Sequence, residues 1–129
     1  MTTEPDLRLS REPIQLVYIA GAYDAPTRQG ELNNIDLAES LAAEVAKLGA
    51  MPVCPHSATR NAVVAAAQPR RFWLAGTMRL LEVCDALITV PGWEQSTGTR
   101  DELAYCFDEG KPFFHTLGEL KSWLEAVNG

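Results

Sequence analysis

Short apolar runs alternate with longer segments of helical periodicity along this chain, and this alternation limits its fold more than any other feature. Each run is typical of a buried strand, and each longer segment is typical of a helix. The expected strands are residues 14–20, 51–54, 86–90 and 113–115, and the expected helices are residues 32–48, 71–83, 99–108 and 117–127. This pattern predicts an α/β fold: an open parallel sheet of about four or five strands with helices on both faces.

The order of the strands predicts where a ligand binds. Right-handed crossovers leave few topologies for a Rossmann-like or flavodoxin-like sheet, and the order 2-1-3-4 places a switch point between the first and third strands. Ligands of such sheets bind outside the carboxyl ends of the strands at that point. The loops expected there are residues 21–23, 55–56 and 91–98. The sequence therefore predicts one crevice formed by these three loops.

Residues 91–102 (PGWEQSTGTRDE) join the third expected strand to the helix that follows it. Such a junction presents free backbone N–H groups and the positive end of a helix dipole to an anion. Glu102 is expected in the first turn of this helix, and a carboxylate beside a phosphate cradle indicates chemistry on a nucleotide or sugar phosphate. The alternative is structural, because Thr99 and Glu102 have the spacing of a capping box, in which Glu102 folds back on the N-cap amide.

The charge distribution favours a small ligand over a large one. The chain has 129 residues and a net charge of −6 at pH 7, which argues against a partner that is a nucleic-acid polymer or a membrane surface. Five arginines nevertheless lie between residues 55 and 100, where only three acidic residues occur. This local excess suits a small anionic ligand, and an ordinary mixed helix surface is the alternative.

Composition and cysteine usage favour a single cytoplasmic domain. We expect residues 1–12 to be a flexible segment and residues 13–129 to form one domain. The sequence shows neither a membrane-span pattern nor a signal-peptide pattern, and Cys54, Cys84 and Cys106 lie among apolar residues, as reduced core cysteines do. Cys54 and His56 lack the paired spacing of a zinc site. We therefore expect no metal and no cofactor.

Several motifs resemble, in order, those of the nucleoside 2-deoxyribosyltransferase superfamily. The resemblance covers residues 14–115, and its motifs are residues 17–23 (VYIAGAY), 33–35 (NNI), 52–56 (PVCPH), 81–86 (LEVCDA) and 91–102. It implies a Rossmann-like fold, cleavage of the N-glycosidic bond of a nucleoside or nucleotide, and assembly into homodimers or larger oligomers. It also implies that Glu102 is the nucleophile and that Tyr18 assists it.

The remaining candidate residues fit this chemistry. Cleavage at C1′ passes through an oxocarbenium-like state that a carboxylate can stabilise or attack. His56 is expected to contact the base or to assist protonation of the leaving group, and Tyr23 and Trp93 to stack on the base or exclude water. Structural packing is the alternative for all three. The other predicted substrate-binding residues are Gly21, Ser96, Gly98 and Thr99.

Two positions refine the resemblance. The superfamily's base-exchanging transferases have an aspartate six residues before the nucleophile, whereas this chain has Ser96, as the nucleotide N-hydrolases do. A neutral serine favours a nucleoside 5′-monophosphate, because an aspartate would repel the phosphate. The superfamily's second catalytic aspartate corresponds to Thr77, which cannot act as a general acid near neutral pH. Either His56 takes that role, or the base departs unaided, or catalysis is absent.

The sequence therefore favours a nucleotide N-glycosidase or a deoxyribosyltransferase. One alternative is a non-catalytic nucleotide-binding module of the same fold, which Thr77 supports. Another is the cytokinin-type phosphoribohydrolases, whose Gly-Thr-x-x-Glu spacing residues 98–102 resemble, although the paired glycines of that family are missing.

The expected helix 71–83 carries more apolar width than one core-facing stripe needs. Its apolar residues include Phe72, Trp73, Leu74, Met78, Leu80 and Leu81. We therefore expect it to pair with its symmetry mate in an isologous homodimer, in which Arg70 or Arg71 reaches the partner's phosphate site.

Overall fold

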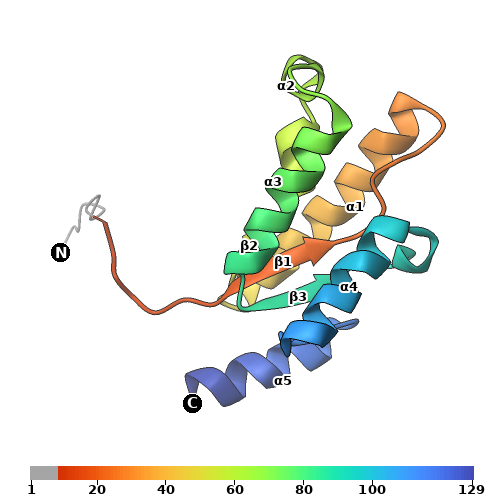
Figure 1. The fold of residues 1–129 in the computed structure, drawn as a ribbon. Coiled ribbons are helices and arrows are strands. Elements are labelled where there is room, and N and C mark those ends of the chain that lie inside the picture. Colours follow the sequence, from red (N-terminus) through yellow and green to blue (C-terminus); the bar gives the residue numbers. More distant parts are fainter. Residues whose placement is uncertain (1–8) are drawn as a thin grey trace.

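The described strands form one parallel sheet. A computed structural model describes residues 9–129, and within them the sheet has the order β2-β1-β3-β4, with each neighbouring pair parallel (Figure 1). The strands are β1 (Leu16–Ala20), β2 (Met51–Val53), β3 (Ala86–Thr89) and β4 (Phe113–Phe114). The predicted α/β class and the order 2-1-3-4 are confirmed. The predicted flexible segment 1–12 lies mostly outside the described residues.

Five helices and two 3-10 turns accompany these strands in the described residues. The helices are α1 (Arg28–Lys47), α2 (Ala62–Ala66), α3 (Arg70–Val83), α4 (Thr97–Glu109) and α5 (Leu117–Asn128), and the turns are η1 (Pro55–Thr59) and η2 (Trp93–Gln95). The predicted start of α1 at Leu32 is wrong, because Thr27 is the N-cap and its hydroxyl accepts a hydrogen bond from the amide of Gly30 at 3.0 Å.

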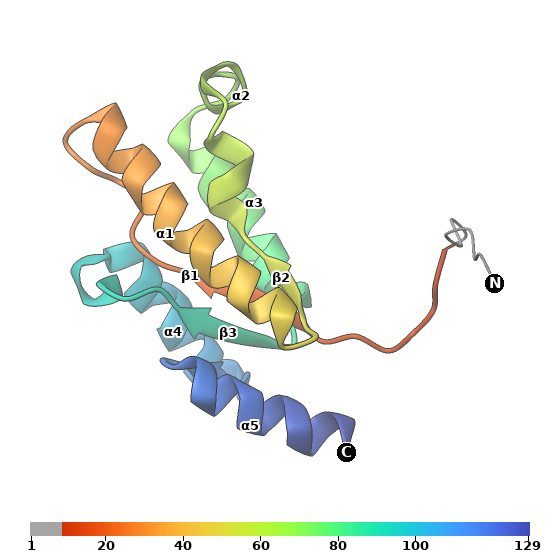
Figure 2. The ribbon, with the colours of Figure 1, turned by 180° about the vertical axis from the view of Figure 1, so that it is seen from behind.

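Side chains of β1 alternate between two cores, one on each face of the sheet. Val17 and Ile19 pack with residues of α1 and α5, which lie in front of the sheet in Figure 2. Tyr18 and Ala20 point to the opposite face and pack with residues of α3 and α4, which lie in front in Figure 1. Helices therefore cover both faces, as predicted.

The parallel arrangement brings the carboxyl ends of β1 and β3 to one edge of the sheet. Ile19 pairs with Ile88 and Ala20 with Thr89 at this edge. The amino-terminal ends of α1 and α3, together with α2, project beyond it (Figure 1). The ends of these helices therefore extend past the sheet on the side where the crevice was predicted.

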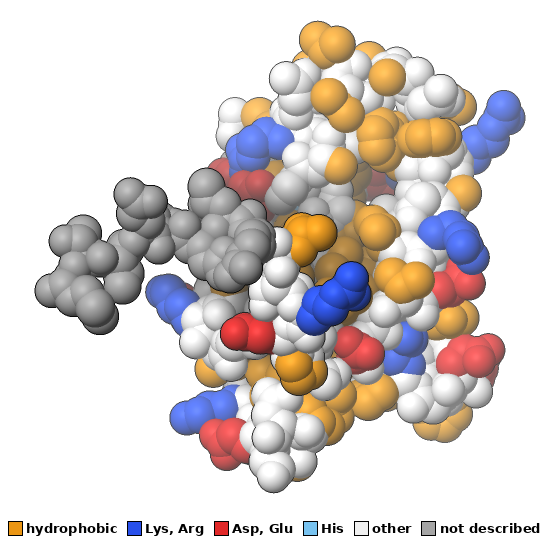
Figure 3. Space-filling model, turned by 90° about the vertical axis from the view of Figure 1, so that its left-hand side faces the viewer, with side chains coloured by type: hydrophobic (Ala, Val, Ile, Leu, Met, Phe, Trp, Pro, Cys, Tyr) orange, Lys and Arg blue, Asp and Glu red, His pale blue; other side chains and the backbone are white. Residues whose placement is uncertain are grey.

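The outer side of α3 leaves apolar side chains in contact with solvent. Phe72, Leu80 and Val83 are 49%, 42% and 62% exposed, whereas Leu81 of the same helix is fully buried. Figure 3 shows apolar side chains gathered on this side of the molecule, most densely toward the end where α2 lies. Within residues 9–129, none of the helices combines the length and apolar character needed to cross a bilayer.

Candidate functional site

A cavity of about 830 Å³ opens at the carboxyl ends of the strands, within the size range of small-molecule sites. Its walls come from the loop after β1, from η1, from α2 and α3, and from the start of α4. The predicted site residues that line it are Tyr18, Gly21, Tyr23, His56, Ser96, Gly98, Thr99 and Glu102. A smaller hollow of about 470 Å³ near the ends of α1 and α5 includes none of them.

A short hydrogen bond joins β1 to α4 in this cavity. The Tyr18 hydroxyl donates to Oε2 of Glu102 at 2.5 Å, at the short end of the range for such bonds. The contact expected between these two side chains is therefore present. Burial raises the pKa of Glu102 to about 7, whereas the bond from Tyr18 lowers it and the charge of Asp101 raises it. Burial also raises the pKa of Tyr18, and the charge of Glu102 adds to that effect.

Ser96 is the N-cap of α4, and the capping-box interpretation of Thr99 and Glu102 is wrong. The Ser96 hydroxyl accepts from the amide of Thr99 at 3.2 Å and from its hydroxyl at 3.1 Å. The helix therefore begins at Thr97, and Glu102 lies in its second turn rather than its first. The Glu102 carboxylate is hydrogen-bonded to Tyr18 and does not cap the helix. Helix capping therefore does not explain why Glu102 lies in the cavity.

The start of α4 offers hydrogen-bond donors to the cavity. The first amides of a helix have no partner within that helix, and Thr97 and Gly98 both line the cavity. A serine hydroxyl has two acceptor lone pairs and one hydrogen, and Thr99 occupies both lone pairs of Ser96. Ser96 can therefore still donate its own hydroxyl hydrogen, so this edge of the cavity is suited to a hydrogen-bond acceptor such as a phosphate oxygen.

His56 forms part of the cavity wall beside Tyr23. Its Nε2 lies 3.1 Å from the carbonyl oxygen of Ala22, and because a carbonyl only accepts, Nε2 carries the hydrogen. Nδ1 is buried and has no partner among the described residues. Burial lowers the pKa of His56, and the Tyr23 ring meets it edge-on at 5.8 Å. The ring is therefore neutral near pH 7, with its N–H already engaged.

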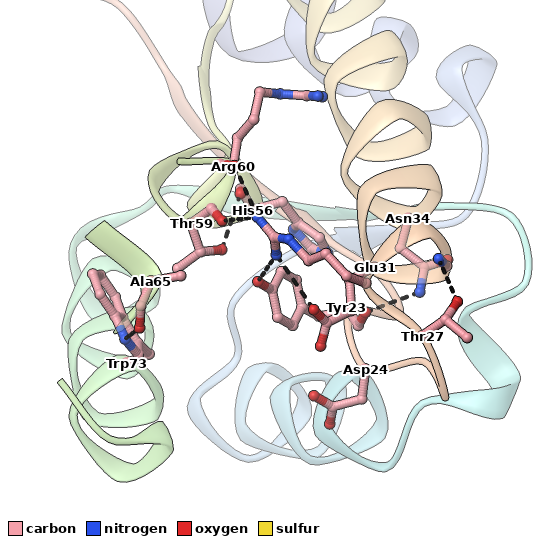
Figure 4. Close-up of polar contacts among 12 residues, drawn as sticks. Tyr23, Asp24, Thr27, Glu31, Asn34, His56, Thr59, Arg60, Ala65 and Trp73 are labelled. Carbon is pink, nitrogen blue, oxygen red and sulfur yellow. Dashed lines mark hydrogen bonds and ion pairs between the residues drawn. The ribbon is translucent and has the colours of Figure 1, made fainter. Parts of the chain in front are cut away.

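Arg28 holds this wall together, although nothing in the local sequence marks it. Its guanidinium donates to the carbonyl oxygens of Thr59 and Arg60 at 2.9 and 2.8 Å and to the Tyr23 hydroxyl at 3.4 Å. The side-chain amide of Asn34 donates to the backbone carbonyl oxygen of Tyr23 at 3.0 Å (Figure 4). These bonds fix Tyr23 between α1 and η1.

The opposite wall contains Trp73, which sequence reasoning assigned only to the apolar face of its helix. Trp73 lines the cavity, and its indole N–H lies 3.3 Å from the carbonyl oxygens of both Ala65 and Gln68 (Figure 4). Asp24 and Arg70 form an ion pair at 2.6 Å between the loop after β1 and the start of α3. Both contacts depend on the distant pairing of segments, which a local pattern cannot reveal.

Gly21 and Trp93 were both predicted to bind substrate, and the structure shows packing contacts for each of them. A Cβ at Gly21 would lie 2.6 Å from that of Val90, so close packing of the loop against β3 requires glycine there. Trp93 does not line the cavity. After Gly92, with φ of 90°, the Trp93 ring stacks on His115 with centroids 4.9 Å apart. The structure therefore places Trp93 beside β4, away from the predicted substrate site.

The fold and the cavity define a Rossmann-like parallel α/β protein with a half-buried carboxylate in the second turn of a helix whose start lines the same cavity. Within residues 9–129, no group of three or more His, Cys, Asp or Glu side chains is arranged to hold a metal ion. The profile of a family described as a domain of unknown function (DUF1937) matches residues 15–117, and the chain belongs to this family. Comparison with curated proteins finds no match.

Proposed function

We propose that this protein is an N-glycosidase that cleaves the base–sugar bond of a nucleoside 5′-monophosphate, with Glu102 as the nucleophile. The observation that carries the proposal is the hydrogen bond from Tyr18 to Glu102 in the cavity. The resemblance to the nucleoside 2-deoxyribosyltransferase superfamily supports it. Transfer of the sugar to a second base is the same chemistry with a different acceptor.

Glu102 has the surroundings that such a nucleophile needs. A carboxylate removed from bulk water interacts more strongly with positive charge that develops at C1′. The Tyr18 hydroxyl occupies Oε2, which leaves Oε1 to attack the sugar and form a glycosyl ester. Water then hydrolyses this ester. Tyr18 is the positioning residue in this scheme.

The start of α4 supports a phosphate as the other part of the ligand. The amides of Thr97 and Gly98 and the hydroxyl hydrogen of Ser96 are donors on the same cavity edge. Donors at a helix N-terminus bind anions, and the helix dipole adds to the attraction. The phosphate would then fix the sugar within reach of Glu102.

A non-catalytic nucleotide-binding module is the second candidate, and Thr77 favours it. Thr77 lines the cavity, and its hydroxyl donates to the carbonyl oxygen of Leu74 at 2.9 Å. No proton donor for the base is supplied from this position. In such a module, Glu102 would bind the sugar hydroxyl groups.

Release of free base from nucleoside monophosphates, measured by chromatography, tests the proposal. Glu102→Gln should reduce release by several orders of magnitude, as loss of a covalent nucleophile does. Glu94→Gln is the control, because Glu94 is exposed on η2 and does not line the cavity. A Glu102→Gln variant that retains most of the activity would remove Glu102 from the mechanism. Binding without any release by the native protein would instead favour the non-catalytic module.

A further inference from the structure

The charged side chains that line the cavity are mostly paired with one another. Arg70 is paired with Asp24 at 2.6 Å, and Arg28 with Glu31 at 3.3 Å. Both arginines therefore lie beside carboxylates that offset their charge. Neither acid of these two pairs is placed to act as a free proton donor in the cavity.

Three further polar side chains of the lining already have their hydrogens engaged. The single N–H of neutral His56 is engaged by the carbonyl of Ala22. The Tyr18 hydroxyl is engaged by Glu102, and the Thr77 hydroxyl donates to Leu74. Glu102 cannot attack C1′ and protonate the leaving base in the same step. Outside the two ion pairs, the described lining thus holds the nucleophile and one further acid, Asp101 at the rim.

Two of the carboxylates that line the cavity are not part of an ion pair among the described residues. Asp101 and Glu102 follow one another on α4, and both line the cavity. Asp101 is exposed at the rim and has no ion-pair partner among residues 9–129. Trp73 and Tyr23 contribute aromatic surface to the same cavity. Carboxylates together with aromatic rings attract a cationic ring, whereas the N-terminus of α4 attracts an anion.

We infer that the substrate is a zwitterionic nucleotide: a 5′-monophosphate whose base is a cationic nitrogen heterocycle, such as an N-ribosylpyridinium or an N7-alkylated purine. The inference rests on the proposed function and specifies its substrate class. The phosphate lies against Ser96, Thr97 and Gly98, and the cationic ring lies toward Asp101 and the aromatic wall. Such a ligand pairs its phosphate with the donors at the start of α4 and its cationic ring with the Asp101 carboxylate, which a neutral base would leave unpaired.

The reaction of such a substrate balances without an acid. Oε1 of Glu102 forms a bond to C1′ as the bond from C1′ to the base nitrogen breaks. The electron pair of that bond moves to the heterocycle and cancels its positive charge, so the base leaves neutral without gaining a proton. Water then hydrolyses the ester, which yields the sugar phosphate, regenerates the carboxylate and releases one proton to solvent.

A pair of substrates that differ by one methyl group tests this inference. Guanosine 5′-monophosphate has a neutral base, and its N7-methyl derivative has a cationic one; nicotinamide mononucleotide supplies the pyridinium case. We expect kcat/KM for base release to be at least about 10²-fold higher for the two cationic nucleotides, because a missing general acid costs about 10²–10⁴-fold on a neutral base. Comparable values for the methylated and unmethylated nucleotides would overturn the inference.

A variant that adds an acid provides a second test. Thr77→Asp should raise release from unmethylated guanosine 5′-monophosphate by about 10²-fold or more relative to its methylated form. An unchanged ratio in a folded variant would contradict the inference that a proton donor is what the neutral substrate lacks. Release from neutral nucleotides alone would overturn the substrate class and leave the proposed N-glycosidase standing. Release from none of the three nucleotides would overturn both proposals.

Discussion

The ionised form of Glu102 is disfavoured in the folded protein, and the neighbouring groups offset this penalty only in part. Burial of a carboxylate disfavours its charged form, and the hydrogen bond from Tyr18 recovers only part of that penalty. A carboxylate held in this state is typical of functional sites, because the fold gains no stability from it. The same burial makes the residue reactive toward a positive centre. Stability and the proposed chemistry therefore make opposite demands on this one side chain.

The raised pKa of Glu102 predicts how stability changes with pH. The folded value of about 7 exceeds the ordinary value of 4.5, so between these values the folded state binds more protons than the unfolded state. Its contribution to stability is therefore complete below pH 4.5 and is lost as pH rises through about 7. Glu102→Gln, which cannot ionise, should be more stable than the native protein by about 1–3 kcal/mol above pH 7.

Urea unfolding at pH 4.5 and at pH 8 measures this difference. The two proteins should have similar stability at the lower pH and should separate at the higher one. Glu94→Gln is the control, because its side chain is exposed. An equal loss of stability in Glu102→Gln at both pH values would indicate that the carboxylate stabilises the fold.

At the scale of the elements, the sequence predicts most of the helices and strands but not where α1 and α4 begin. The apolar periodicity of α3 and the apolar run of β3 are properties of neighbouring residues, and both segments were predicted within one residue. The start of α4 was predicted at Thr99, whereas Ser96 is the N-cap, and only the folded loop shows this.

The site could be predicted to the same extent. The resemblance indicates Tyr18 and Glu102, which lie within β1 and in the second turn of α4, and the structure brings them together. Arg28 and Trp73 could not be found, because their roles depend on contacts with η1 and α2. Trp93 was misplaced because the turn at Gly92 directs its ring toward His115. Long-range geometry, rather than residue type, decides these three cases.

The N-cap of α4 predicts a double effect of one substitution. Ser96→Ala should lower stability by about 1 kcal/mol through loss of the cap and should weaken binding of a nucleoside monophosphate by about 1.5–3 kcal/mol through loss of a donor to phosphate. Thr116→Ala is the control, because the Thr116 hydroxyl also caps a helix by accepting from an amide three residues on, and Thr116 does not line the cavity.

Thermal unfolding and calorimetry separate the two effects when binding is measured in the Glu102→Gln background, which prevents turnover. Both alanine variants should unfold at a lower temperature, and only Ser96→Ala should bind the monophosphate less tightly. Equal affinity of the Ser96→Ala variant and its parent would mean that phosphate does not bind at the start of α4.

At the scale of the whole molecule, the exposed side of α3 predicts self-association. Phe72, Leu80 and Val83 lie exposed on one helix, and such a patch is unusual on a monomer. We expect an isologous homodimer in which this helix packs against its symmetry mate. Arg70 is engaged by Asp24 of its own chain, so Arg71 is the better candidate to reach the partner.

Light scattering at micromolar concentration tests the dimer. Phe72→Glu and Leu80→Glu should yield monomers, because each would bury an unpaired charge in the interface. Val127→Glu is the control and should leave the mass unchanged, because Val127 is exposed near the end of α5 and away from α3 in the sequence. A monomer mass for the native protein would exclude this assembly.

The two outer strands of the sheet have a consequence for fibril formation. β2 has three residues with Pro52 at its centre, and β4 has only two residues. A further strand needs a row of free backbone donors and acceptors along the edge it joins, and a short edge or a proline denies it that row. The sheet formed by residues 9–129 therefore offers no template for cross-β growth. Preformed fibrils of this chain should not recruit it until it unfolds.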